Sequence, residues 1–199
     1  MAAIILIGKN VVKDENGGLP VSSADLLLHP VRLRVVQAFL GDRALTTSEL
    51  RAELPDVPVA TLYRHVGVLA DAGVLTVSGE RKVRGAAERT YRLDLAAASV
   101  GAAEAAAMTA EEHRRAFTTF AVALMADFDR YLARTAPDAE RPDLTGDRVG
   151  YRQVAVWVTD EEFDEMIGEF AAVLRARMAN RPGGGRRRRV VTTVHLPAE

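Results

Sequence analysis

Residues 31–94 show an order of predicted elements that few folds accommodate. A helix with one apolar face is expected over 31–40, and a Thr-Thr-Ser-Glu capping box starts a short helix over 47–54. After a three-residue break, a third helix is expected over 58–73, opened by a proline and closed by a glycine. A hairpin with a polar, Arg-rich loop follows over 74–93. Helix, short helix, tight turn, helix and basic hairpin together predict a winged helix-turn-helix.

The third helix has the side chains that a helix needs in the major groove of DNA. A helical wheel places Val59, Leu62, Val66 and Leu69 toward the core. On the outward side, a small residue permits close approach, and an arginine can make two hydrogen bonds to guanine or contact a phosphate. An ordinary amphipathic surface helix shows the same periodicity, so the wheel alone leaves both interpretations open. The residues expected to contact bases are Ala60, Thr61, Tyr63 and Arg64.

The hairpin favours the nucleic-acid interpretation. The stretch 81–92 holds five basic residues and one acidic residue, although the formal net charge of the whole chain is only -1. A basic hairpin at this distance from the third helix can lie along phosphates or in a minor groove. The residues expected to do so are Arg81, Lys82, Arg84 and Arg89.

Five stretches of the chain resemble the ArsR-type winged-helix transcriptional regulators. They are His29–Val36, Thr47–Leu50, Ala60–Val66, Leu69–Leu75 and Arg84–Leu93. The resemblance covers roughly residues 24–94, and it implies a DNA-binding regulator, most commonly a repressor. It adds Thr47, Ser48 and His65 to the residues expected at DNA, with a structural role as the alternative for His65, which the helical wheel places near the edge of the core. The chain departs from the family at Tyr63, where the family's recognition signature has a serine.

Metal sensing, which some members of that family perform, finds no support in the sequence. The chain has no cysteine, and its four histidines are scattered singly at positions 29, 65, 113 and 195. We therefore expect no metal site and no cofactor. An effector, if one acts on the protein, is expected to be a non-metal small molecule.

The second half of the chain predicts a helix-strand-helix-strand part. Helices are expected over 109–134 and 159–178, each behind a capping box, and strands over 148–158 and 189–196. The first of these helices is apolar over much of its circumference, which favours a partner helix and a homodimer. The N-terminal segment Ile4–Val12 is β-prone, and it can join this sheet or cross to a second subunit.

A mixed aromatic and polar sheet face in this second part is interpreted as an ordinary sheet face under the two long helices, with a small-molecule pocket as the alternative. Arg186–Arg189 is interpreted as a solvated loop, with a second phosphate contact as the alternative. The residues expected around the pocket are Phe120, Tyr151, Gln153, Trp157 and His195.

Taken together, the sequence predicts a mainly α protein with a small β component (α+β). The expected parts are an extension over 1–23, a winged helix-turn-helix over 24–95, a linker over 96–108 and a dimerisation and effector part over 109–199. No phosphate-binding glycine loop, paired metal histidines or nucleophile elbow is present, so we expect no enzyme. The apolar run near the start is too short to span a bilayer, which favours a cytoplasmic protein. The alternative function is a winged-helix module that binds an acidic protein partner.

Overall fold

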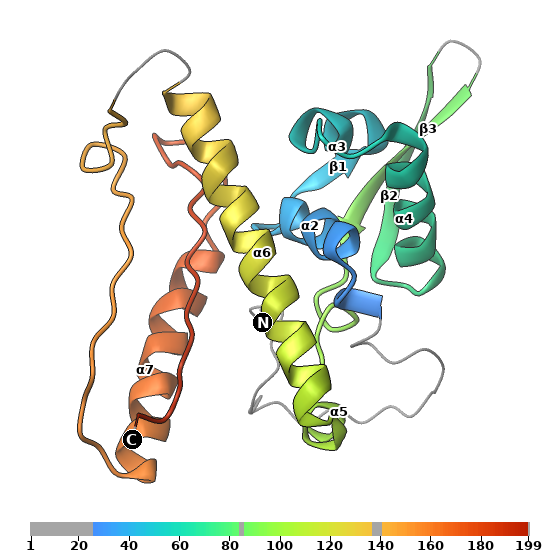
Figure 1. Cartoon of the computed structure of the whole chain (residues 1–199). Helices are drawn as coiled ribbons and strands as arrows, with labels where there is room; N and C mark the ends of the chain where they lie inside the picture. Colours follow the sequence, from blue (N-terminus) through green and yellow to red (C-terminus); the bar gives the residue numbers. More distant parts are fainter. Residues whose placement is uncertain (1–25, 84–85, 137–140, 199) are drawn as a thin grey trace. The chain divides into compact units, whose positions relative to one another are not determined.

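The computed structural model describes residues 26–83, 86–136 and 141–198 (Figure 1). It confirms the mainly α fold with a small sheet, and the winged helix-turn-helix precedes the other helices. By contacts, the chain separates into a unit over 3–133 and a unit made of residues 1–2 and 134–199. The elements of the first unit are α2 (Pro30–Phe39), β1 (Ala44–Thr46), α3 (Thr47–Glu53), α4 (Val59–Asp71), β2 (Leu75–Val83), β3 (Ala86–Leu93), α5 (Ala102–Ala107) and α6 (Ala110–Thr135).

Local capping explains where the first helices begin. Thr46 Oγ1 accepts from the Glu49 N–H at 3.2 Å, and Glu49 Oε2 accepts from the Thr46 N–H at 2.7 Å, so α3 starts with the predicted capping box. His29 caps α2 instead of a hydroxyl residue, because its Nδ1 accepts from the Val31 N–H at 3.2 Å. Pro58 precedes α4 and supplies no side-chain cap.

The sheet is small and antiparallel, with strand order β1-β3-β2. β1 pairs only with the base of β3, from Ala44 opposite Arg92 to Thr46 opposite Thr90. β2 and β3 continue beyond β1 as a two-stranded ribbon, and the register shifts at Val77/Gly79 where the ribbon leaves the three-stranded part. We call this ribbon, residues 79–90, the wing.

The wing differs from the sequence prediction in extent. We expected a polar loop over 78–88, but β2 and β3 run through most of it, so Arg81 and Lys82 lie in β2 and Arg89 in β3. Charged residues have low strand propensity, and cross-strand pairing overrides that preference here. Arg84 lies outside the described residues.

The core lies under the helix-turn-helix. It joins α2, α3 and α4 to the sheet, and Ala105 of α5 reaches its edge. Val59 is a correction to the helical wheel, because it is exposed rather than buried: it lies in the first turn of α4, which projects past the core. The largest fully buried side chains are Phe39, Leu27, Leu33, Leu50, Leu54, Leu62, Leu69 and Leu75.

The described part of the second unit holds α7 (Asp160–Met178), which starts with the predicted capping box at Thr159 and Glu162. The strands expected over 148–158 and 189–196 do not form in the described residues. Both segments have β-prone residues, but a strand exists only with a partner to complete its hydrogen bonds, and no described strand pairs with them. Among the described residues, no helix combines the length and apolar character that a bilayer crossing requires.

Candidate nucleic-acid interface

The exposed side of α4 carries the residues predicted to contact DNA. Ala60, Tyr63 and Arg64 are exposed and Thr61 is half-buried. Tyr63 is the largest apolar surface on this helix, with half of its side chain in solvent. The opposite side packs Leu62, Val66 and Leu69 into the core. The helix therefore presents a small residue, a hydroxyl, a phenol and a guanidinium from a fixed platform.

A paired ionic contact joins α2 to the turn between α3 and α4. Both terminal nitrogens of Arg34 on α2 donate to the two carboxylate oxygens of Asp56 at 2.7 Å. Asp56 lies in the turn between α3 and α4, and these hydrogen bonds from Arg34 are the main reason that its pKa is lowered. The contact ties the turn of the helix-turn-helix to α2.

His65 is the one residue of α4 that the sequence predicted at DNA and the structure places in the core. It is 5% exposed, and its ring lies 4.3 Å from the ring of His29, measured between centroids. We therefore remove His65 from the candidate DNA contacts. Burial lowers the pKa of both histidines, and the positive charges of Arg32 and Arg64 lower the pKa of both further.

This pair predicts a loss of stability in mild acid. The pKa of each histidine is below its usual value near 6.5 in the folded protein, so the unfolded chain takes up protons first as the pH falls. The contribution of the pair to the free energy of unfolding is complete above about pH 6.5. It is lost as the pH drops below that value. Protonated His29 also has no lone pair at Nδ1 with which to cap α2.

Urea unfolding of the wild type at pH 7.5 and at pH 5.5 measures this loss. His65→Gln is expected to reduce the difference between the two pH values, whereas His113→Gln, a change at an exposed position of α6, is expected to leave it unchanged. An equal pH dependence in all three proteins is the result that contradicts this role of the pair.

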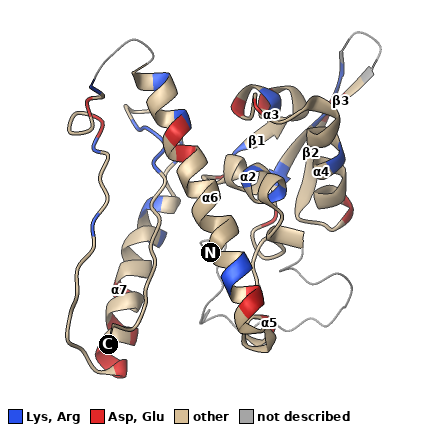
Figure 2. Cartoon of the chain, in the orientation of Figure 1, with Lys and Arg blue, Asp and Glu red and all other residues tan. Residues whose placement is uncertain are grey.

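The wing adds a basic edge beside α4 (Figure 2). Arg81, Lys82 and Arg89 are exposed, with 77% of the Arg81 side chain in solvent. Arg89 and Glu80 form an exposed cross-strand pair at 3.4 Å. Thr47 and Ser48 are the first two residues of α3, and Ser48 contacts the wing directly.

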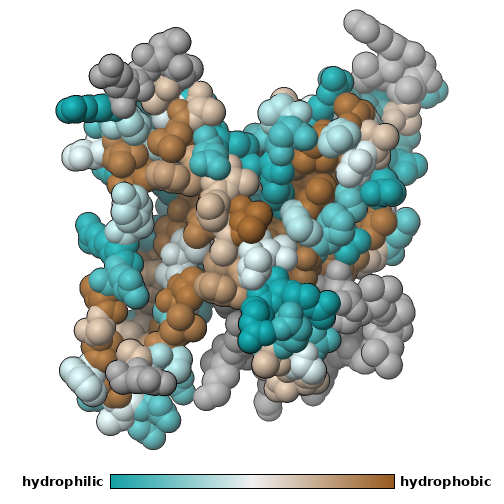
Figure 3. Space-filling view, in the orientation of Figure 1, coloured by the Kyte–Doolittle hydropathy of each residue, from teal (hydrophilic) through white to brown (hydrophobic). Residues whose placement is uncertain are grey.

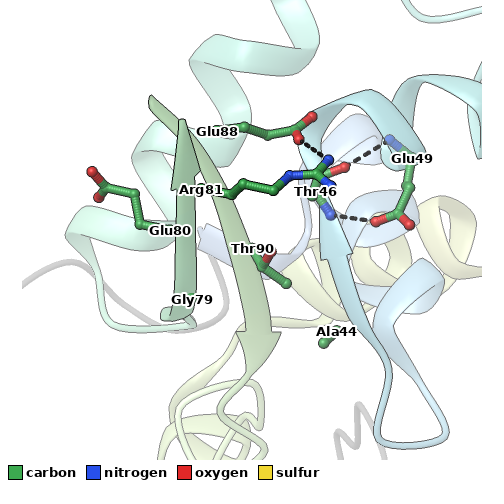
Figure 4. A pocket seen from close by; sticks show the side chains of 8 residues that line it. All are labelled: Ala44, Thr46, Glu49, Gly79, Glu80, Arg81, Glu88 and Thr90. Carbon is green, nitrogen blue, oxygen red and sulfur yellow. Dashed lines mark hydrogen bonds and ion pairs between the residues drawn. The ribbon is translucent and has the colours of Figure 1, made fainter. Parts of the chain in front are cut away.

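Glu88 joins the wing to the helix-turn-helix, a role that the sequence did not predict. Its carboxylate accepts from Ser48 Oγ on α3 at 2.9 Å. It also accepts from Arg81 on β2 at 3.0 Å, as Figure 4 shows. These contacts, Arg81 first, hold the pKa of Glu88 below its usual range. The charge pattern showed Glu88 only as the one acid in a basic stretch, because its partner Ser48 is 40 positions away in the sequence.

A shallow depression of about 410 Å³ lies between the base of the wing and the start of α3 (Figure 4). Glu88 and Arg81 close one side of it, and Thr46 and Glu49 of the capping box close another. The depression is open to solvent and mixes both charge signs, so it is a seam between two elements rather than a ligand cavity.

Replacing Glu88 is expected to loosen the wing. Glu88→Ala removes the contact that holds the wing to α3 beyond the end of β1, so the amides of residues 79–83 and 87–90 should exchange with solvent severalfold faster. Glu88→Gln keeps an oxygen that accepts from Ser48 and should restore part of the protection. The matched control is Glu80→Ala, which breaks a wing ion pair that does not reach α3. Equal exchange in the Glu88→Ala and Glu80→Ala proteins contradicts the role of Glu88.

The residues predicted around an effector pocket do not share a sheet face. Tyr151, Gln153, Trp157 and His195 are all exposed, and the strands that were to bring them together are absent from the described residues. Phe120 is half-buried on α6. His195 instead contacts Phe163 of α7 edge-on, with ring centroids 5.8 Å apart. Within the described ranges, no three potential metal ligands cluster.

The comparison with protein-family models agrees with the helix-turn-helix part of this fold. Residues 27–78 match a family model described as a helix-turn-helix domain, so the chain carries a helix-turn-helix domain over these residues. One solved structure that resembles the chain is described as "Crystal structure of Possible transcriptional regulator for arsenical resistance". It is 23% identical, with a TM-score of 0.31, over 58% of this chain and 97% of that chain. The comparison with curated proteins gave no match.

Proposed function

We propose that the protein is a sequence-specific, double-stranded DNA-binding transcriptional regulator that acts as a homodimer. The observation that carries this proposal is the exposed face of α4, where Ala60, Thr61, Tyr63 and Arg64 stand on a helix anchored in the core. In a helix-turn-helix protein, the second helix of the motif enters the major groove with its N-terminal residues at the base edges. These four residues lie in the first two turns of α4.

The wing and α3 supply the contacts that position the protein. The wing reaches DNA phosphates or a minor groove with Arg81, Lys82 and Arg89. The start of α3 approaches the sugar-phosphate backbone of the DNA with Thr47 and Ser48. Such contacts set the register but carry no sequence information, so the base preference comes from α4.

The homodimer follows from symmetry and from exposed apolar side chains. A two-fold dimer presents two recognition helices to two half-sites. On α6, Phe117, Leu124 and Met125 are between 41% and 65% exposed, a large apolar surface for a helix in a monomer. We place at least part of the dimer contact here.

Regulation is proposed to work by repression. A dimer bound over a promoter excludes polymerase, and a non-metal small molecule bound to the part over 109–199 changes the spacing of the two recognition helices. Such a regulator works where the DNA is, which in a bacterial cell is the cytoplasm.

The test is a titration of fluorescent duplexes with purified protein. One duplex carries the region upstream of the protein's own gene, and a second carries the same bases in scrambled order. If the protein binds these two equally, a third duplex, selected from a random pool for binding, provides the preferred site. Binding that favours one sequence, with log K falling linearly with log salt, supports the proposal. Absence of binding to any duplex at low salt contradicts it and favours a protein-binding winged helix with an acidic partner.

A further inference from the structure

Residues 141–198 have many apolar side chains and bury none of them. α7 has no buried residue, and its best-covered side chains, among them Phe163, Ile167 and Leu174, are only half-buried. Apolar residues are plain at the surface around α7 in Figure 3. A folded unit needs two packed layers around a core, so this part of the chain lacks a layer.

Two segments of this unit have the composition of strands without strand partners. We call 148–158 the first segment and 189–196 the second segment. Trp157 is 101% exposed, Val154 84% and Leu196 76%. Unpaired backbone beside apolar, β-prone side chains is a template for another strand, so the missing layer is a sheet.

Within one chain the two segments run in the same direction. α7 lies between them in the sequence and runs the opposite way (Figure 1). At one end, Arg187 lies 3.8 Å from Asp147, which immediately precedes the first segment. At the other end, His195 contacts Phe163 in the first turn of α7. One chain thus offers only a parallel arrangement, with the starts of both segments at the same end.

The charges at the segment ends give the antiparallel arrangement more ion pairs, because the arginines meet one acid, Asp147, in the parallel arrangement and three acids in the antiparallel one. The first segment leads into the acidic start of α7, where Asp160, Glu161 and Glu162 lie, and the second follows Arg186–Arg189 (Figure 2). In one chain α7 separates these groups by about 28 Å, because 19 residues of helix rise 1.5 Å each. Antiparallel pairing brings the acids and the arginines to the same end. Because the two segments of one chain run parallel in the structure, a second copy is the source of this pairing.

We propose that the first segment of one copy pairs antiparallel with the second segment of another copy, so that two copies share a sheet that covers the apolar side of α7. A two-fold axis makes both exchanges equivalent, and each arginine run then meets the acidic helix start of the other copy. The inference rests on the proposed homodimer and identifies where its core lies.

The chain has no cysteine, so introduced cysteines report this pairing directly. Gln153→Cys and Thr193→Cys, near the middles of the two segments, are made in separate full-length chains. The two proteins are then mixed, unfolded, refolded together and treated with a short bismaleimide. A covalent dimer in the mixture, and little in either protein alone, is the expected result.

Three results overturn the proposal. Sedimentation as a dimer without a cross-link in the mixture places the dimer core elsewhere, such as on α6. A chain with both cysteines that links only within itself, at monomer mass, shows pairing in one chain. A monomer at micromolar concentration whose first-segment amides are protected from exchange shows that another part of the same chain covers it. The DNA titration is independent of all three, so it separates failure of this inference from failure of DNA binding.

Two matched variants test the same surface without cross-linking. Val154→Glu places a charge in the first segment, and Val77→Glu makes the same change on β2, where the side chain is 51% exposed. We expect Val154→Glu to raise the dimer dissociation constant at least tenfold in sedimentation experiments and Val77→Glu to leave it near the wild-type value. An unchanged dimer dissociation constant in Val154→Glu contradicts the proposed pairing of segments between two copies.

Discussion

Arg64→Ala is expected to remove most of the sequence preference of DNA binding while leaving the fold intact. Arg64 is exposed on α4, so its removal leaves no cavity. An arginine that makes two hydrogen bonds to a guanine contributes about 1–3 kcal/mol of discrimination per half-site. In a dimer the change occurs at both half-sites, and the ratio of affinities for preferred and scrambled duplexes falls accordingly.

The control for this variant separates base contact from general charge. Arg115→Ala removes one exposed positive charge on α6, outside the helix-turn-helix. It is expected to keep the preference of the wild type. Fluorescence anisotropy at two salt concentrations with both duplexes gives the ratio, and an unchanged ratio in Arg64→Ala refutes base contact by this residue.

Leu62→Ala is expected to have the largest effect on stability. Leu62 is fully buried on the core side of α4, so the substitution leaves a cavity beneath the helix proposed to read DNA. Leucine-to-alanine changes in cores cost about 2–5 kcal/mol, and whole domains are stable by only about 5–15 kcal/mol. Much of the helix-turn-helix is therefore expected to unfold at moderate temperature.

Val59→Ala on the same helix is the matched control. Val59 is 39% exposed, so its truncation removes little buried surface. Urea denaturation followed by circular dichroism should show a large drop in midpoint for Leu62→Ala and a small one for Val59→Ala. Similar midpoints for the two variants contradict the burial difference on which the prediction rests.

The features predicted from the sequence are those that contacts between residues close in the sequence determine. The boxes at Thr46 and Thr159 place helix starts through contacts three residues apart, and the helices of the helix-turn-helix follow from apolar periodicity. The match of residues 27–78 to a helix-turn-helix family model confirms that prediction.

Contacts between distant residues were not predictable. The tilted ring contact of His65 with His29 and the hydrogen bond from Ser48 to Glu88 join positions that only the tertiary fold brings together. The strands expected over 148–158 and 189–196 failed for the opposite reason. Both segments have residues with high strand propensity, which is a local property. A strand also needs a neighbouring strand to complete its hydrogen bonds, and the described residues provide no such neighbour.

The uneven placement of the core also determines how this protein absorbs heat on unfolding. Among the described residues, the buried apolar side chains lie between Leu26 and Ala105, apart from two alanines of α6. Unfolding raises the heat capacity by about 12–15 cal/mol/K per residue in ordinary domains, because apolar surface enters water. A chain of 199 residues with a uniform core would show about 2.4–3.0 kcal/mol/K. A single copy of this chain exposes much of residues 141–198 already, so its increment is expected to fall well short of that value. The proposed association of two copies would restore the missing part by burying that surface.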